Sequence, residues 1–357
     1  MPERLRPARA FTVRSGIRHI IISDFLCTIN ERKEETRDMD KLMSAAMIAV
    51  RDCMAVKEGE NVLIITDEPL RKIGYALWEA AGSLGAEAVI TEIIPRKSNG
   101  EEPPATVGEF MKLFDAVLIP TQKSLSHTES RRNASKAGVR IATLPGITEE
   151  TMVRTLNADY EIIAERSKRL AEIISRGSNV RVTTEKGTDI NLVIEGREGS
   201  ADTGLNHNPG DFSNLPAGEA YVAPLEGRSS GVVVFDGSMA GVGKLIDEVI
   251  RVRVEEGFAT EITGGRGAEK LLSIMTPFGK LAFNLAELGI GTHDKALITG
   301  SVLEDEKVIG TIHIAFGDNK SMGGTVRVAS HLDGVVMKPT VEVDGELIMK
   351  EGRLLIF

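Results

Sequence analysis

The sequence contains little cysteine, no long hydrophobic run and no excess of basic residues. Cys27 and Cys53 are the only cysteines in 357 residues. They are too few for a disulfide scaffold and lack the C-x-x-C spacing of a zinc or redox site, so both are expected to be structural thiols in a reducing cytoplasm. No apolar stretch approaches the roughly 18 residues of a membrane-spanning helix. Lysine and arginine number 43 against 52 acidic residues, and the net charge of −9 argues against binding to nucleic-acid phosphates. The composition predicts a globular cytoplasmic protein with neither a membrane nor a nucleic acid as partner.

Glycine is scarce in the first half of the chain and abundant in the second. Ten of the 36 glycines lie in residues 1–177, and 26 lie in residues 178–357. At about 150 residues per domain, the length also predicts two domains. Residues 1–40 are expected to be an N-terminal extension and not a signal peptide, because neither an apolar segment of adequate length nor a small-residue cleavage site follows its arginines. The predicted domains are residues 41–177 and 178–357.

Residues 41–177 show the pattern of an open α/β domain with a largely parallel sheet. Short apolar runs alternate with helical periodicity, as buried parallel strands and their crossover helices do. The four runs lie at residues 61–66, 88–94, 115–120 and 139–145. A helix over 159–176 ends the domain. Thr66-Asp67-Glu68 stands where a dinucleotide-binding fold needs a glycine-rich loop, so no nucleotide is expected there.

Residues 178–357 change to a periodicity of two, which predicts a mixed, β-rich α+β domain. The expected strands lie at 180–184, 190–194, 232–235, 249–254, 340–343 and 346–349. Asp344-Gly345, between the last two strands, is a strong hairpin signal. Two helices are expected, over 268–275 and 281–288.

The residues that could carry chemistry lie in this second domain. His331-Leu-Asp333 would place an imidazole and a carboxylate on one face of an extended strand, where both can reach one ion. His313 stands in the apolar strand Thr-Ile-His-Ile-Ala-Phe-Gly, where a polar group costs free energy unless it is bonded. Glu306 lies in an acidic cluster, and Glu219 and Glu287 lie among small or apolar neighbours. Each has an alternative interpretation. His331 and Asp333 would then be a satisfied surface or turn pair, and His313 a core histidine bonded to a backbone carbonyl. The three glutamates would be solvated carboxylates.

Four short motifs follow one another in this domain. They are Asn214-Leu-Pro-Ala-Gly-Glu219, Leu285-Ala-Glu287-Leu-Gly-Ile-Gly291, Asp305-Glu306 ahead of His313-Ile-Ala-Phe-Gly317, and His331-Leu-Asp333. Their composition and order resemble the aminopeptidase T and aminopeptidase S family of metallo-exopeptidases. The resemblance implies removal of N-terminal residues from small peptides, and a homodimer.

The same resemblance implies a centre of two divalent ions, zinc, cobalt or manganese, that share Glu287. The remaining ligands would be Glu219, His313, His331 and Asp333. Glu306 would be the general base that takes the proton of a metal-bound water and passes it to the leaving amine.

One departure separates the chain from those peptidases. They carry a tyrosine a few residues after the segment that matches His313–Gly317, whereas Asp318-Asn319-Lys320 stands here and the last tyrosine is Tyr221. A tetrahedral oxyanion would need another donor, such as Lys320 or Asn319. The same segment, together with His331-Leu-Asp-Gly, also resembles the 2,5-dihydroxypyridine 5,6-dioxygenases, a related iron(II) ring-cleaving family.

This second resemblance implies iron(II) held by two histidines and one carboxylate, with open positions for oxygen and substrate. His293 would then be a further ligand or an acid–base group, or else an exposed loop histidine. A third interpretation is a binding protein that has kept the fold and lost catalysis. The sequence alone favours the peptidase, with the dioxygenase as the alternative.

Overall fold

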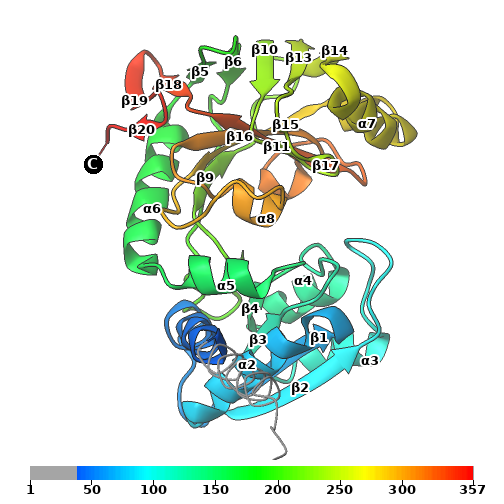
Figure 1. Cartoon of the computed structure of the whole chain (residues 1–357), viewed down its shortest axis with the longest axis vertical. Helices are drawn as coiled ribbons and strands as arrows, with labels where there is room; N and C mark the ends of the chain where they lie inside the picture. The colour runs from blue at the N-terminus through cyan, green and yellow to red at the C-terminus, as the bar shows by residue number, and fades with distance from the viewer. Residues whose placement is uncertain (1–37, 357) are drawn as a thin grey trace, which may run out of the picture.

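Three sheets organise the chain in a computed structural model that describes residues 38–356. The sheet of the first domain lies at one end of the molecule and the sheets of the second domain lie at the other (Figure 1). The predicted N-terminal extension falls outside the described residues as far as residue 37, and residues 38–40 already belong to a helix that runs to residue 47. Within the described part, no helix is long and apolar enough to cross a membrane.

Sheet A is a parallel sheet of five strands in the order β2-β1-β3-β4-β8. Alternate residues of β1 enter two different cores, Val62 and Ile64 on one face and Leu63 and Ile65 on the other. A strand buried on both faces has a continuous apolar run, and this confirms the predicted open α/β domain. Its elements are η1 (Ile48–Cys53), β1 (Asn61–Asp67), η2 (Glu68–Leu70), α2 (Arg71–Ser83), β2 (Glu87–Ile93), α3 (Ala105–Met111), β3 (Ala116–Ile119), α4 (Glu129–Lys136), β4 (Arg140–Thr143), α5 (Glu149–Leu156), α6 (Tyr160–Arg176) and, from later in the chain, β8 (Phe212–Asn214).

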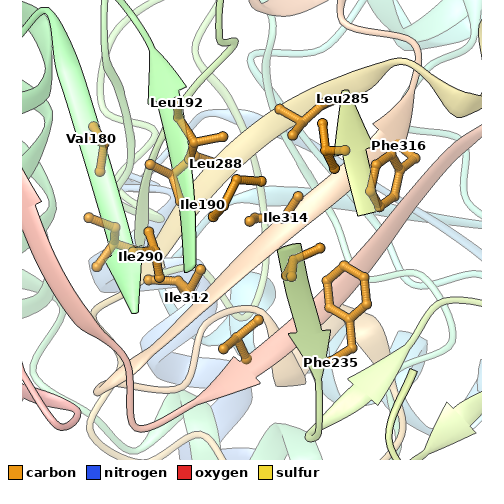
Figure 2. Packing of buried hydrophobic residues seen from close by; sticks show 14 of the residues in the cluster. Val180, Ile190, Leu192, Phe235, Leu285, Leu288, Ile290, Ile312, Ile314 and Phe316 are labelled. Carbon is orange, nitrogen blue, oxygen red and sulfur yellow. The ribbon is translucent and has the colours of Figure 1, made fainter. Parts of the chain in front are cut away.

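The β-rich part consists of two antiparallel sheets that share one hydrophobic core. Side chains of sheet B such as Val180 and Leu192 meet side chains of sheet C such as Leu288 and Ile314 (Figure 2). Sheet B has the order β14-β13-β10-β6-β5-β18-β19-β20, and sheet C has the order β12-β11-β17-β16-β15-β9-β7.

The elements of this part follow in chain order. They are β5 (Asn179–Thr183), β6 (Asp189–Val193), β7 (Ser200–Asp202), β9 (Glu219–Val222), β10 (Ser230–Phe235), β11 (Ser238–Met239), β12 (Gly243–Lys244), β13 (Ile250–Glu255), β14 (Phe258–Thr263), α7 (Gly265–Met275), η3 (Thr276–Phe278), η4 (Lys280–Phe283), β15 (Leu285–Gly291), α8 (Val302–Asp305), β16 (Thr311–Gly317), η5 (Lys320–Met322), β17 (His331–Met337), β18 (Thr340–Val343), β19 (Glu346–Lys350) and β20 (Arg353–Leu354).

The predicted helix over 281–288 is wrong. Only Lys280–Phe283 is helical, as a short 3-10 turn, and Leu285–Gly291 is strand β15. Leu, Ala and Glu are good helix formers, but β15 is hydrogen-bonded to β16 on one side and β9 on the other, and this pairing overrides local propensity. Glu287 therefore lies on a strand.

The two domains contact each other at places other than the predicted boundary at residue 177. Helix α6 ends at Arg176, but β8 lies beyond it and returns to pair in parallel with β4 of sheet A. A buried ion pair also joins the domains. The Glu304 carboxylate of α8 is 0% exposed and accepts hydrogen bonds from the Arg154 guanidinium and the Thr151 hydroxyl of α5.

Candidate metal centre

Neighbouring strands of sheet C bring five predicted ligands to one face of that sheet. Glu219 begins β9, Glu287 lies on β15, His313 lies on β16, and His331 and Asp333 lie on β17. The register places Ala315 opposite both Glu287 and Asp333, and this aligns the site across the central strand. Because side chains alternate along a strand, the intervening residues point to the opposite face, as Leu288, Ile312 and Ile314 do in Figure 2.

A glycine on the site face makes room for the imidazole of His313. Gly289 pairs with His313 across the two strands. A β-carbon on Gly289 would lie 2.0 Å from both Cε1 and Nε2 of the His313 ring. Only glycine at position 289 leaves room for this ring against the neighbouring strand, and this explains one of the glycines that enrich the second half of the chain.

The distances among these side chains fit a metal ion. His331 Nε2 lies 3.0 Å from Glu287 Oε2 and 3.3 Å from Asp333 Oδ1. His313 Nε2 lies 3.4 Å from Glu287 Oε1 and 3.4 Å from Glu219 Oε2. Metal–ligand bonds of about 2.1 Å place neighbouring ligand atoms about 3.0 Å apart in an octahedron and about 3.4 Å apart in a tetrahedron. Three overlapping groups could each hold an ion: Glu219, Glu287 and His313; Glu287, His331 and Asp333; and Glu306, His313 and Asp333.

The buried carboxylates of the site also favour a bound cation. Glu219 Oε2 is buried and finds no hydrogen-bond donor among the described residues. Burial disfavours a charged imidazole, but the hydrogen bond with Glu287 and the charges of Glu219 and Glu287 outweigh it and raise the pKa of His313 to about 9. Burial likewise opposes the charge of Glu287, yet hydrogen bonds from His313 and His331 lower the pKa of its carboxyl far below the usual range. A divalent ion would satisfy the same carboxylates that these protons satisfy.

A second layer of contacts orients His331. Its Nδ1 lies 2.7 Å from the carbonyl oxygen of Asp318, in the loop that follows β16. Such a partner fixes the ring and its tautomer, as is common for metal-bound histidine. The loop is fastened in turn by the Glu226 carboxylate, which accepts hydrogen bonds from the Asn319 amide and the Thr325 backbone N–H and pairs with Arg197.

Glu306, the predicted general base, lies at the edge of this cluster. Its ligand atoms are within 4.8 Å of those of His313 and Asp333. Burial and the neighbouring charges of Glu219 and Asp333 raise the pKa of its carboxyl to about 8, although Lys307 opposes the shift. The Glu306 side chain is 13% exposed and its Oε1 lies 2.8 Å from Lys307 Nζ. Lys307 was not predicted from the sequence, because a lysine beside acidic residues is usually a solvated surface residue.

His293 is not a ligand, and it is not exposed. The residue is fully buried, with Nε2 3.0 Å from the Thr155 carbonyl oxygen, and its Nδ1 accepts from the Lys295 backbone N–H. Burial lowers the pKa of His293 to about 4, so the ring is neutral at pH 7. It joins the domains structurally.

One of the two predicted oxyanion donors, Asn319, has another role. The Asn319 amide is buried and donates to Glu226, while its oxygen accepts from the Val326 backbone N–H. Asn319 thus shapes the loop that holds His331, and Lys320 is exposed. The Asn319 amide is thus engaged within the loop and is not free to act where the peptidases have their tyrosine.

The first domain contributes one further residue near the centre. His127 lies in the loop between β3 and α4. Desolvation by the neighbouring protein, followed by the charges of His331 and Arg131, lowers its pKa, although the residue remains exposed to solvent. Its place beyond the carboxyl end of a parallel strand is a common location for binding residues and is the only sequence signal that could have indicated it.

A parallel α/β domain joined to a β-sandwich that carries a Glu/His/Asp cluster defines a metal-dependent class of enzyme. Within that class, the chain belongs to the 2,5-dihydroxypyridine 5,6-dioxygenase family, which it matches over residues 42–356. It is 23% identical over 259 residues to the 2,5-dihydroxypyridine 5,6-dioxygenase of Pseudomonas putida, covering 67% of this chain and 71% of the relative.

Two solved structures share the fold. The 2,5-dihydroxypyridine dioxygenase from P. putida KT2440 superposes with a TM-score of 0.78 at 19% identity, over 88% of this chain and 97% of that one. Wild-type AmpT from Thermus thermophilus superposes with a TM-score of 0.66 at 21% identity, over 89% and 99%. Both predicted resemblances are therefore present. The family match favours the dioxygenase alternative, and the peptidase interpretation is not confirmed.

Proposed function

We propose that the protein is an iron(II)-dependent dioxygenase that opens the ring of a hydroxylated pyridine. The family match over residues 42–356 supports the reaction class. The observation that carries the proposal is the convergence of two imidazoles, His313 and His331, with the Glu287 and Asp333 carboxylates at 3.0 to 3.4 Å. Two histidines and a carboxylate that leave open positions are the ligand set of non-haem iron oxygenases.

Bound iron(II) would supply the positions at which dioxygen and an electron-rich ring react. Both oxygen atoms would enter the product, and the ring itself would supply the electrons. The protein's own residues would hold the ion and move the proton. Glu306 is the candidate for accepting the proton of a substrate hydroxyl, because its carboxylate borders the His313 and Asp333 ligand atoms.

The peptidase is the second candidate, since the groups around Glu287 could also hold two ions that share this carboxylate. Two observations weigh against it. No tyrosine follows Gly317, and the Asn319 amide, which could have replaced it, is bound to Glu226. Without a donor for the oxyanion, the tetrahedral intermediate of peptide hydrolysis would lose roughly 3–4 kcal/mol of stabilisation.

Paired assays on the full chain test the proposal. Protein loaded with iron(II) without oxygen is mixed with 2,5-dihydroxypyridine and air, and the loss of ring absorbance is compared with oxygen uptake. We expect one oxygen consumed per ring opened, with no amino acid released from aminoacyl-amides by the zinc, cobalt or manganese forms. Amino-acid release without oxygen uptake would establish the peptidase instead. Absence of bound metal after repletion would support the non-catalytic alternative.

A further inference from the structure

A buried lysine lies among three carboxylates beside the metal ligands. Lys307 is 1% exposed. Its Nζ lies 2.5 Å from Glu219 Oε1, 2.8 Å from Glu306 Oε1 and 3.6 Å from Asp202 Oδ2. These carboxylates come from β9, the turn after α8 and β7, so three separate segments converge on one ammonium group.

The backbone directs this side chain inward. The Lys307 N–H donates to the Glu304 carbonyl, and its own carbonyl accepts from the His293 N–H. Position 291 must lack a β-carbon for the segment to approach β15, because a β-carbon there would lie 2.1 Å from the Val308 carbonyl oxygen. The location of the ammonium is therefore built into the strand and turn geometry.

Glu219 connects this ammonium to the metal centre. One of its oxygens, Oε1, is held by Lys307, while Oε2 faces His313 Nε2 at 3.4 Å. In a two-ion centre, Glu219, Glu287 and His313 would hold the second ion. A second divalent ion at Glu219 would thus lie next to a fixed positive charge in a poorly solvated environment, where like charges repel strongly.

We propose that the Lys307 ammonium takes the place of a second divalent cation and limits the centre to one ion. Asp202, Glu219 and Glu306 are the carboxylates it neutralises. Lys307 is thus a positioning residue that holds Glu219 and Glu306 without being a ligand. The inference rests on the proposed function only for the identity of the native ion, and its test requires no turnover.

The test counts Mn²⁺ bound to the purified full chain, by elemental analysis and electron paramagnetic resonance. We expect one ion per wild-type chain with the spectrum of an isolated Mn²⁺. Lys307→Met removes the charge and keeps the bulk, so the freed carboxylates should take up a second ion with exchange coupling between the two. Lys295→Met, the same change at an exposed lysine, should stay at one ion.

Two outcomes would overturn the proposal: two coupled ions in the wild type, or one ion in a folded Lys307→Met variant. If that variant does not fold, the wild-type ion count and the Lys307→Arg variant still test the proposal. Lys307→Arg keeps the charge and should therefore keep one ion. A count of one that rises to two in Lys307→Met, in a protein that opens no ring, would refute the proposed function and leave this inference standing.

Discussion

The His313 ring occupies the space that a β-carbon on Gly289 would fill, with Cε1 and Nε2 both 2.0 Å from that position. Gly289→Ala should therefore push His313 away from Glu287. We expect metal affinity to fall by about 100-fold or more, which is the upper range for disturbing a ligand's orientation. Overpacking should also cost about 1–3 kcal/mol of stability. Calorimetric titration with Mn²⁺ and urea denaturation measure the two effects.

Gly82→Ala is the matched control for this substitution. Gly82 lies in α2, and a β-carbon there would meet nothing within 4 Å. The helix should gain about 0.5–1 kcal/mol and the metal affinity should not change. Unchanged Mn²⁺ binding by Gly289→Ala would show that the ring is not held against that strand.

Asp333→Asn tests the charge of a candidate ligand with almost no change of shape. Asp333 Oδ1 lies 3.3 Å from His331 Nε2. An amide oxygen is a weaker metal ligand than a carboxylate, and Glu287 would be left as the one carboxylate beside His331 Nε2. Mn²⁺ affinity should therefore fall more than the roughly 100-fold seen for outer-shell partners. Asp294→Asn, at an exposed residue, should bind normally. Equal affinities for both variants would remove Asp333 from the ligand set.

The interdomain pair offers a test of stability. Arg154→Leu leaves the Glu304 carboxylate, which is 0% exposed, without its guanidinium partner. Breaking such a buried pair should cost about 3–5 kcal/mol. Arg176→Leu removes a 4.0 Å pair with Glu172 whose side chains are 82% and 68% exposed, and should cost less than about 1 kcal/mol. Urea denaturation midpoints compare the two variants, and equal midpoints would contradict the role given to Glu304.

Glu226 makes the stability of the His331 loop depend on pH. Burial opposes its charge, but hydrogen bonds from the Thr325 backbone and the Asn319 amide, with the Arg197 charge, lower its pKa below the ordinary 4.5. A lowered folded-state pKa stabilises the protein above the unfolded value, and this stabilisation is lost as pH falls through the folded value. Glu226→Gln should cost about 1–3 kcal/mol at pH 7, and the difference from wild type should shrink below pH 4. A difference that is constant with pH would show that the carboxylate charge does not act.

Strands that are buried on both faces, or that alternate cleanly, could be predicted from the sequence. The apolar run at 61–66 is β1, and the expected pairing of His331 with Asp333 on one strand face is confirmed by β17. In both cases the sequence pattern follows from the alternation and burial of residues within that single strand.

Features that depend on distant pairing could not be predicted. Glu287 stands in a locally helical sequence, and only its neighbours β9 and β16 make it part of a strand. Lys307 owes its burial to Asp202 and Glu219, which lie about a hundred residues earlier in the chain. No spacing in the sequence records such a contact, because strand order in sheet C differs from chain order.

Strand β8 has a consequence for how this protein can vary. It ends at Asn214, at the edge of the sheet of the first domain, and β9 opens with Glu219 in the sheet that carries the ligands. Cutting the chain after α6 would deprive sheet A of its edge strand, and cutting it after β8 would separate the sandwich from β5, β6 and β7. No single cut of the chain therefore yields two parts that each keep every strand of their sheets, so the two domains cannot be separated or swapped at one junction.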